Sequence, residues 1–134
     1  MSSTNFPNGV KTFPADDVNQ IIKTGNATLT NAECISGYPI VVTGDGGVDL
    51  TLPDAAAGNA GAVVTVVNKS NGGYVLVTPH SSDFIAYGGA VVINKYVGNG
   101  SGSMRKGDYI TLIRSVAATD WTVTAVSGVW TKEA

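Results

Sequence analysis

The 134-residue chain has little charge and few side chains that form disulfides or bind metals. Its 8 Lys and Arg and 10 Asp and Glu give a net charge of −2, so it lacks a basic face to neutralise nucleic-acid phosphates. A single cysteine, Cys34, permits no intrachain disulfide, and a single histidine, His80, excludes a centre built from several imidazoles. We therefore expect no nucleic-acid partner, no metal and no cofactor.

Long apolar runs are also missing from the sequence. No segment approaches the roughly 20 apolar residues that span a membrane, and the polar start MSSTNFPNG lacks the plan of a signal peptide. We expect a soluble protein made in a cytoplasm, with no membrane partner. Only 13% of the residues are charged, against about 25% in a typical domain. We interpret this deficit as surface that is buried against neighbouring subunits.

Short β-rich runs separated by Gly and Asn fill the chain from residue 27 onward, which is typical of a sandwich or barrel. The number of runs exceeds the usual size of one sheet, so they are expected to divide between two packed sheets. We therefore predict an all-β, antiparallel, jelly-roll-like β-sandwich over residues 27–134. Helix signals and long internal repeats are not evident, and residues 97–103 are predicted to be a flexible Gly/Ser loop. The nine predicted strands are 27–30, 39–43, 48–52, 62–68, 74–78, 84–87, 90–94, 109–116 and 121–126.

Apolar and polar residues alternate along the predicted strands and assign their two faces. In the run 48–52, Val48, Leu50 and Leu52 are predicted to face the core. In the run 109–114, Ile113 falls on the outer face beside Tyr109. The pair forms an exposed apolar stripe suited to a subunit contact, unless a bulge turns Ile113 elsewhere. In the last run, alternation puts Trp121, Val123 and Ala125 on one face.

Residues 1–26 are predicted to form an arm outside the sandwich domain. Two Phe-Pro pairs favour extended backbone before each proline. After the second pair, residues 15–23 are predicted to form two turns of helix. Apolar anchors in an otherwise polar arm indicate that the arm docks on another surface. The candidate contact residues are Phe6, Pro7, Phe13, Pro14, Val18, Ile21 and Ile22.

The segment His80-Ser81-Ser82-Asp83 contains the residue types of a catalytic triad. Neighbours in one turn point in different directions, however, whereas a triad is assembled from separate elements. The chain also lacks a Gly-x-Ser-x-Gly nucleophile elbow and a phosphate-binding Gly-rich loop. We therefore predict that the protein is not an enzyme and that His80 is a solvated turn residue.

Residues 43–49, Thr-Gly-Asp-Gly-Gly-Val-Asp, are the best metal candidate, because hard cations prefer clustered carboxylate and carbonyl oxygens. The stretch lacks the carboxylate spacing of an EF-hand and has no second copy with which to form a calcium-binding β-helix repeat. We favour a tight β-turn in which Gly supplies positive φ and Asp bonds its own backbone.

Aromatic residues near predicted loops form the last candidate site. Tyr38, Tyr74, Tyr87 and Tyr96 would suit a carbohydrate-binding platform of exposed rings beside polar groups. Core and subunit packing explains the same residues without a ligand, and we favour that explanation. Cys34 has no basic neighbour in sequence, so we expect a small buried apolar residue.

The segment Asp49–Gly58 resembles a "TLPxAAAG" motif of β-domains in structural proteins of tailed bacteriophages. Those domains continue with a short strand before proline, a Gly-rich turn, a "GDxxTLI" strand and a closing Trp strand. Here the corresponding segments are Val75–Pro79, Gly88–Gly89, Gly107–Ile113 and Trp121–Trp130. The resemblance covers roughly residues 27–131 and is a pattern of turns and strands rather than a catalytic fingerprint.

This resemblance implies a capsid decoration (cement) protein that is made in the host cytoplasm and resides on the virion surface. Such proteins are commonly homotrimers, carry no active site and stabilise the head by binding at junctions of the major capsid protein. The alternative is a fibre or tail-tip module that binds host-surface glycans through its aromatic loops. Fold resemblance alone does not decide between them, because function resides in sites.

Overall fold

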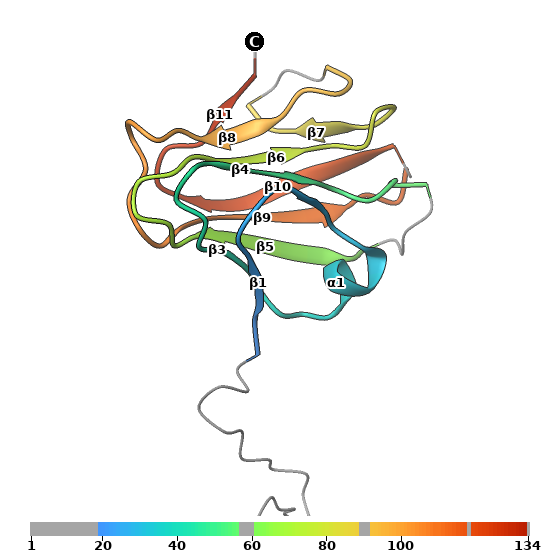
Figure 1. The fold of residues 1–134 in the computed structure, drawn as a ribbon. Helices are drawn as coiled ribbons and strands as arrows, with labels where there is room; N and C mark the ends of the chain where they lie inside the picture. The colour runs from blue at the N-terminus through green and yellow to red at the C-terminus, as the bar shows by residue number, and fades with distance from the viewer. Residues whose placement is uncertain (1–18, 57–60, 89–91, 118, 134) are drawn as a thin grey trace, which may run out of the picture.

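The computed structural model describes residues 19–56, 61–88, 92–117 and 119–133, which form two β-sheets and one short helix (Figure 1). The six-stranded sheet, here sheet A, has the order β1-β3-β5-β9-β10-β7, and the five-stranded sheet B has the order β11-β8-β6-β4-β2. The prediction of an all-β protein is confirmed. The elements are β1 (Ile21–Lys23), β2 (Ala27–Thr28), α1 (Asn31–Ile35), β3 (Ile40–Val42), β4 (Val48–Thr51), β5 (Val63–Asn68), β6 (Val75–Thr78), β7 (Phe84–Ala86), β8 (Val97–Asn99), β9 (Asp108–Arg114), β10 (Asp120–Ser127) and β11 (Thr131–Lys132).

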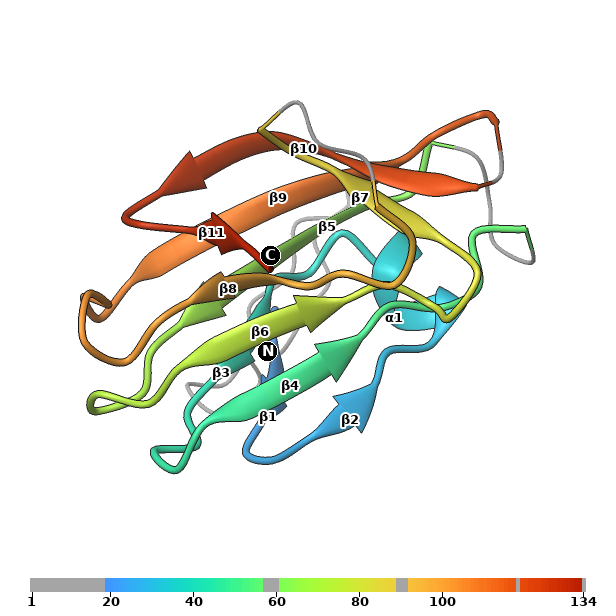
Figure 2. The same cartoon turned by 90° about the horizontal axis from the view of Figure 1, so that it is seen from above.

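From β1 to β6 the chain alternates between the two sheets, and each strand pairs in parallel with the strand two places earlier. The three resulting coils stack as in a parallel β-helix, as Figure 2 shows from above. The prediction of antiparallel sheets is therefore wrong for five of the nine strand pairs in the described part of the chain. Gly- and Asn-rich turns at 24–26, 43–47 and 69–74 carry the chain from sheet A to sheet B instead of closing hairpins.

The third coil is closed by antiparallel strands. β9 pairs with β5 and then with β10, while β8 pairs with β6 and then with β11. The predicted flexible loop at 97–103 is wrong at its start, because Val97–Asn99 form the buried strand β8. Gly98 permits this placement, since a Cβ there would lie 2.7 Å from Leu76 Cδ2. The described part of the predicted strand 90–94, residues 92–94, lies outside any strand.

The buried side chains of both sheets form one apolar cluster. Val48, Leu50 and Leu52 all belong to it, as their alternation predicts, and Cys34 is buried as expected. Burial raises the pKa of the Cys34 thiol to about 12, assisted by the negative charge of Glu33. The thiol is therefore a packing group rather than a nucleophile.

Alternation persists through β9, so Tyr109, Thr111 and Ile113 share the outer face of sheet A. The bulge lies instead in β10, where the register shifts between Val123 and Ala125. The prediction that Ala125 shares the face of Trp121 is therefore wrong, because the extra residue reverses the side-chain direction.

Residues 21–23 form the edge strand β1 rather than the end of the predicted helix, which is a correction. Backbone bonds from Ile21 N to Pro39 O (2.9 Å) and from Thr43 N to Lys23 O (3.0 Å) hold this strand to β3. The helix that does form, α1, begins at a capping box in which Thr30 and Glu33 each bond the other's backbone N–H. The boundary between arm and domain after residue 26 stays a prediction, although β1 belongs to sheet A.

Candidate functional site

The parallel pairing of β4 and β6 brings two turns of the chain together. Thr51 is the register partner of Thr78, and the ladder continues through Leu52 N to Thr78 O at 2.8 Å. Parallel strands end at the same edge of a sheet, so the residues that follow them become neighbours. Asp54 follows β4, and His80 and Asp83 follow β6.

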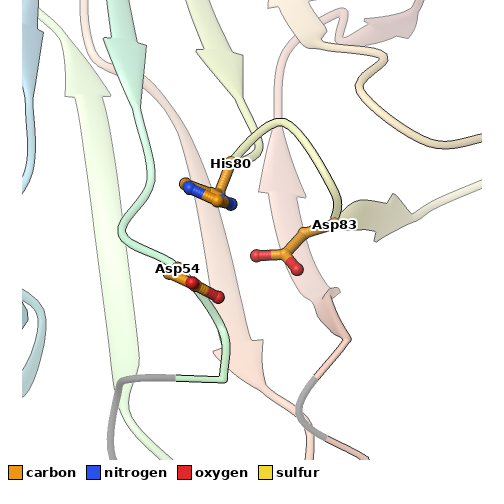
Figure 3. Close-up of side chains that lie close together, drawn as sticks. All are labelled: Asp54, His80 and Asp83. Carbon is orange, nitrogen blue, oxygen red and sulfur yellow. The ribbon is translucent and has the colours of Figure 1, made fainter.

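Asp54, His80 and Asp83 point toward one another in the close-up of Figure 3. One ligand atom from each, two carboxylate oxygens and an imidazole nitrogen, lies within 4.8 Å of the others. Asp83 is only 4% exposed, whereas Asp54 and His80 are half-buried. Oxygen and imidazole ligands in one cluster can hold a divalent cation of the first transition row.

Asp83 also holds the turn after β4 in place. Its Oδ2 accepts a hydrogen bond from Ala55 N at 2.8 Å, while the buried Arg114 donates its Nε–H to Ala55 O. Asp54 Oδ1 accepts from Ala56 N at 2.9 Å and so closes a small Asx turn. The backbone of this turn is thus bonded from both sides, and it presents Asp54 to His80.

The triad interpretation of residues 80–83 gains no support from this geometry. Ser82 Oγ lies 3.4 Å from His80 Nδ1, longer than the roughly 2.6–3.2 Å typical of a base and its nucleophile. Asp83 bonds the backbone of Ala55 rather than orienting the imidazole. That the protein is not an enzyme stays a prediction.

On β5 and β9, the outer face of sheet A is an uncharged surface. Its outward residues there are Val, Thr, Tyr and Ile, and Val63 is the register partner of Ile113. Val63 is 46% exposed and Tyr109 is 38% exposed. Exposed apolar area that spans neighbouring strands is typical of an interaction surface. The outward positions on the three longest strands are Val63, Thr65, Val67, Tyr109, Thr111, Ile113, Thr122, Ala125 and Ser127.

The opposite sheet carries a tyrosine-lined hollow of about 380 Å³. Tyr74 and Tyr96 line it together with Leu76, Gly100 and Ser101. Of the four tyrosines of the predicted platform, the structure thus brings two together at this hollow. The other two, Tyr38 and Tyr87, do not line it.

The Tyr74 ring packs directly against the backbone of Gly47. An added Cβ at Gly47 would lie 2.2 Å from Tyr74 Cε2, so the absence of a side chain there makes room for the ring. A second hollow of about 500 Å³ lies beside the first. Asp49 lines the second hollow and is the register partner of Leu76, which lines the first. Its lining residues are polar except for Ala27: Asn26, Thr28, Asp49 and Thr51.

The residues singled out in the arm have different outcomes. Phe6, Pro7, Phe13, Pro14 and Val18 lie outside the described residues. Ile21 packs against the core cluster, and Ile22 is 47% exposed on β1.

Residues 43–47 form a turn as predicted, but the expectation that Asp bonds its own backbone there is wrong, because both carboxylates accept hydrogen bonds from other parts of the chain. Asp45 accepts from the backbone and side chain of Asn71, which holds the pKa of Asp45 below its usual range. Asp49 accepts from Thr78 Oγ1 at 2.7 Å and donates its N–H to Asn26 Oδ1 at 2.8 Å. Gly47 has φ +95°, as a tight turn requires.

Asp54 is the site residue that sequence reasoning missed. It was read only as part of the Asp49–Gly58 motif, and nothing local connects it to His80. Only the sheet topology connects the two residues. Asp54 follows β4 and His80 follows β6, and these two strands are parallel neighbours that both end in Thr.

A scan against the models of known protein families and a search of curated protein sequences each found no match. Within the described ranges, no helix is long and apolar enough to cross a membrane.

Proposed function

We propose that the chain is a virion structural protein that decorates the outside of a bacteriophage head as a homotrimer and stabilises junctions of the major capsid protein. In this proposal the two sheets form a β-sandwich and residues 1–26 serve as its arm. The observation that carries the proposal is the uncharged outer face of sheet A, centred on β5 and β9. The resemblance of residues 27–131 to phage structural domains adds to it.

An apolar face of this kind suits a contact between copies of the chain. Burying Val63, Tyr109 and Ile113 removes apolar area from water at about 25 cal/mol per Å². Threonines between them add hydroxyl groups without charge, such as the Thr65 and Thr111 pair whose Oγ1 atoms lie 2.9 Å apart. A lysine placed in such a contact would leave an unpaired buried charge.

Light scattering tests the trimer. The full-length protein is expected to have the mass of a trimer, and Ile113→Lys is expected to dissociate it into folded monomers. Val116→Lys is the matched control, because Val116 is 88% exposed in a turn beyond the end of β9. A wild-type monomer at every concentration, or a trimer that tolerates Ile113→Lys, would contradict this assignment of the face.

Capsid binding needs a separate measurement. We expect Phe6→Ala combined with Phe13→Ala to lower occupancy on heads of the parent virus while the trimer mass stays unchanged. Undiminished occupancy would show that the two phenylalanines of residues 1–26 do not contribute to capsid binding.

The tyrosine-lined hollow favours a second candidate function, a fibre or tail-tip module that binds host-surface glycans. Aromatic rings stack against the C–H face of a sugar ring, and nearby amide and carboxylate groups bond its hydroxyls. A glycan array would test this function, with Tyr74→Ala expected to abolish the signal and Tyr38→Ala as the control. Tyr38 is similarly exposed, at 44% against 39% for Tyr74, but lies outside the hollow. A signal that survives Tyr74→Ala would show that glycans do not bind in this hollow.

A further inference from the structure

We propose that Asp54, His80 and Asp83 form a binding site for one divalent transition-metal ion, with Zn²⁺ preferred over Mg²⁺ and Ca²⁺. The two carboxylates and the imidazole come from separate turns that the parallel pairing of β4 and β6 holds side by side (Figure 3). This site goes beyond capsid decoration and does not depend on it.

The donor set determines the class of ion. Ca²⁺ and Mg²⁺ prefer oxygen ligands throughout, whereas an imidazole nitrogen beside carboxylates suits Zn²⁺ and its first-row neighbours. Zn²⁺ binds such ligands at about 2.0–2.2 Å. The ligand atoms already lie within 4.8 Å of one another, and half-buried side chains at Asp54 and His80 can close around an ion by small rotations.

The buried carboxylate of Asp83 supplies an independent reason to expect a cation. Asp83 is 4% exposed, and buried charges in proteins are either paired or bound to metals. The ion pairs among the described residues join Lys23 to Glu33 and Lys95 to Glu133, so neither of them neutralises Asp83. The buried Arg114 donates to Ala55 O, while Asp83 accepts from Ala55 N, so the guanidinium lies near Asp83 but bonds the backbone of Ala55. A metal ion between Asp83 and Asp54 would place a positive charge in direct contact with both carboxylates.

The turn after β4 is held by hydrogen bonds before any ion binds, which leaves only small side-chain rotations for ion binding. The Ala55 N–H holds Asp83, and the Asx turn at Asp54 holds the other carboxylate. Three protein ligands leave at least one coordination position for water, as in open zinc sites. Binding would then cross-link the turn after β4 to the turn after β6 and stabilise both.

Calorimetric titration of the untagged full-length protein with Zn²⁺, after removal of metal by a chelator, tests the site. We expect one Zn²⁺ per chain and a higher midpoint of thermal unfolding with Zn²⁺, but no shift with Mg²⁺ or Ca²⁺. His80→Ala and Asp54→Asn should each weaken binding at least about 10- to 100-fold, the loss seen even for groups that only support a ligand. Asp45→Asn is the control, since it removes an exposed carboxylate from a different turn.

A spectroscopic readout identifies the ligand independently of affinity. Cu²⁺ bound at this site should show pulsed-EPR modulation from a single imidazole, and His80→Ala should abolish it. The proposal is overturned if wild type and His80→Ala bind Zn²⁺ equally, or if the Cu²⁺ spectrum carries no imidazole signal. Cys34 does not compete, because its thiol is buried and its pKa is raised to about 12.

Discussion

Replacing Asn99 by alanine should remove the centre of a buried polar network that joins the two sheets. Asn99 is fully buried on β8, donates to Asp108 Oδ2 and to Val129 O at 3.0 Å each, and accepts from Asn68 Nδ2 at 2.8 Å. Asp108 also accepts from Arg105 N at 2.9 Å. Two of the three bonds of Asn99 therefore connect β8 of sheet B to β5 and β9 of sheet A, and the third reaches the turn between β10 and β11.

The size of the effect follows from these bonds. The bond to the Asp108 carboxylate is worth about 1.5–3 kcal/mol, and each of the two neutral bonds is worth about 1 kcal/mol. Asn99→Ala should therefore lower the free energy of unfolding by roughly 3–5 kcal/mol. For a chain of this length, that corresponds to a drop of about 10–20 °C in the unfolding midpoint.

Urea unfolding followed by tryptophan fluorescence measures this loss, because Trp121 and Trp130 are both buried in the folded chain. Asn71→Ala is the matched control, since Asn71 is exposed in the turn between β5 and β6 and bonds the exposed Asp45. Asn71→Ala should lower the free energy of unfolding by less than about 1 kcal/mol. If Asn99→Ala costs no more than Asn71→Ala, the network does not hold the sheets together.

Three further predictions concern single residues. Cys34 should resist a thiol reagent at pH 8 in the folded protein and react once urea unfolds it, because burial raises its pKa to about 12. Burial raises the pKa of Glu33, but hydrogen bonds from Lys23 and Thr30 and the charge of Lys23 outweigh burial and leave the pKa below its usual range. The ionised Glu33 therefore stabilises the fold at neutral pH, and this stabilisation is lost as acid protonates the carboxylate. The stability difference between wild type and Glu33→Gln should thus shrink between pH 7 and pH 3, and a constant difference would contradict this. Gly128→Ala should destabilise more than Gly72→Ala in urea titrations, since both residues have positive φ but only at Gly128 would a Cβ meet a side chain, the carboxyl of Asp108 at 2.2 Å.

Side-chain alternation predicted most strands, because it depends only on which face of a strand is buried. The core face of β4 and the outward direction of Ile113 on β9 both follow from it. Strand partners do not follow from it, since the same alternation fits a parallel or an antiparallel neighbour. The parallel coils were therefore recognised only from the structure, in which Ile40 pairs with Val66 and Leu50 pairs with Val77.

One strand was missed because its local sequence signals oppose its final state. Gly98 and Gly100 indicate a loop, yet the packing of Leu76 over Gly98 makes Val97–Asn99 a buried strand. The cluster of Asp54, His80 and Asp83 was missed for a different reason, since Asp54 and His80 are distant in sequence and meet only because two turns follow parallel neighbours. Sequence reasoning singled out His80 and Asp83 but predicted that His80 is a solvated turn residue, with a triad as the less favoured interpretation.

The first coil leaves the starting edges of both sheets side by side. Within the described residues β1 pairs only with β3, and β2 pairs only with β4, so each has backbone N–H and C=O groups on its other side. Another chain segment that crossed this end could extend both sheets at once, much as a template lengthens a fibre. The shortness of β1 and β2, three and two residues, limits such templated growth, as short edge strands do in other β-proteins.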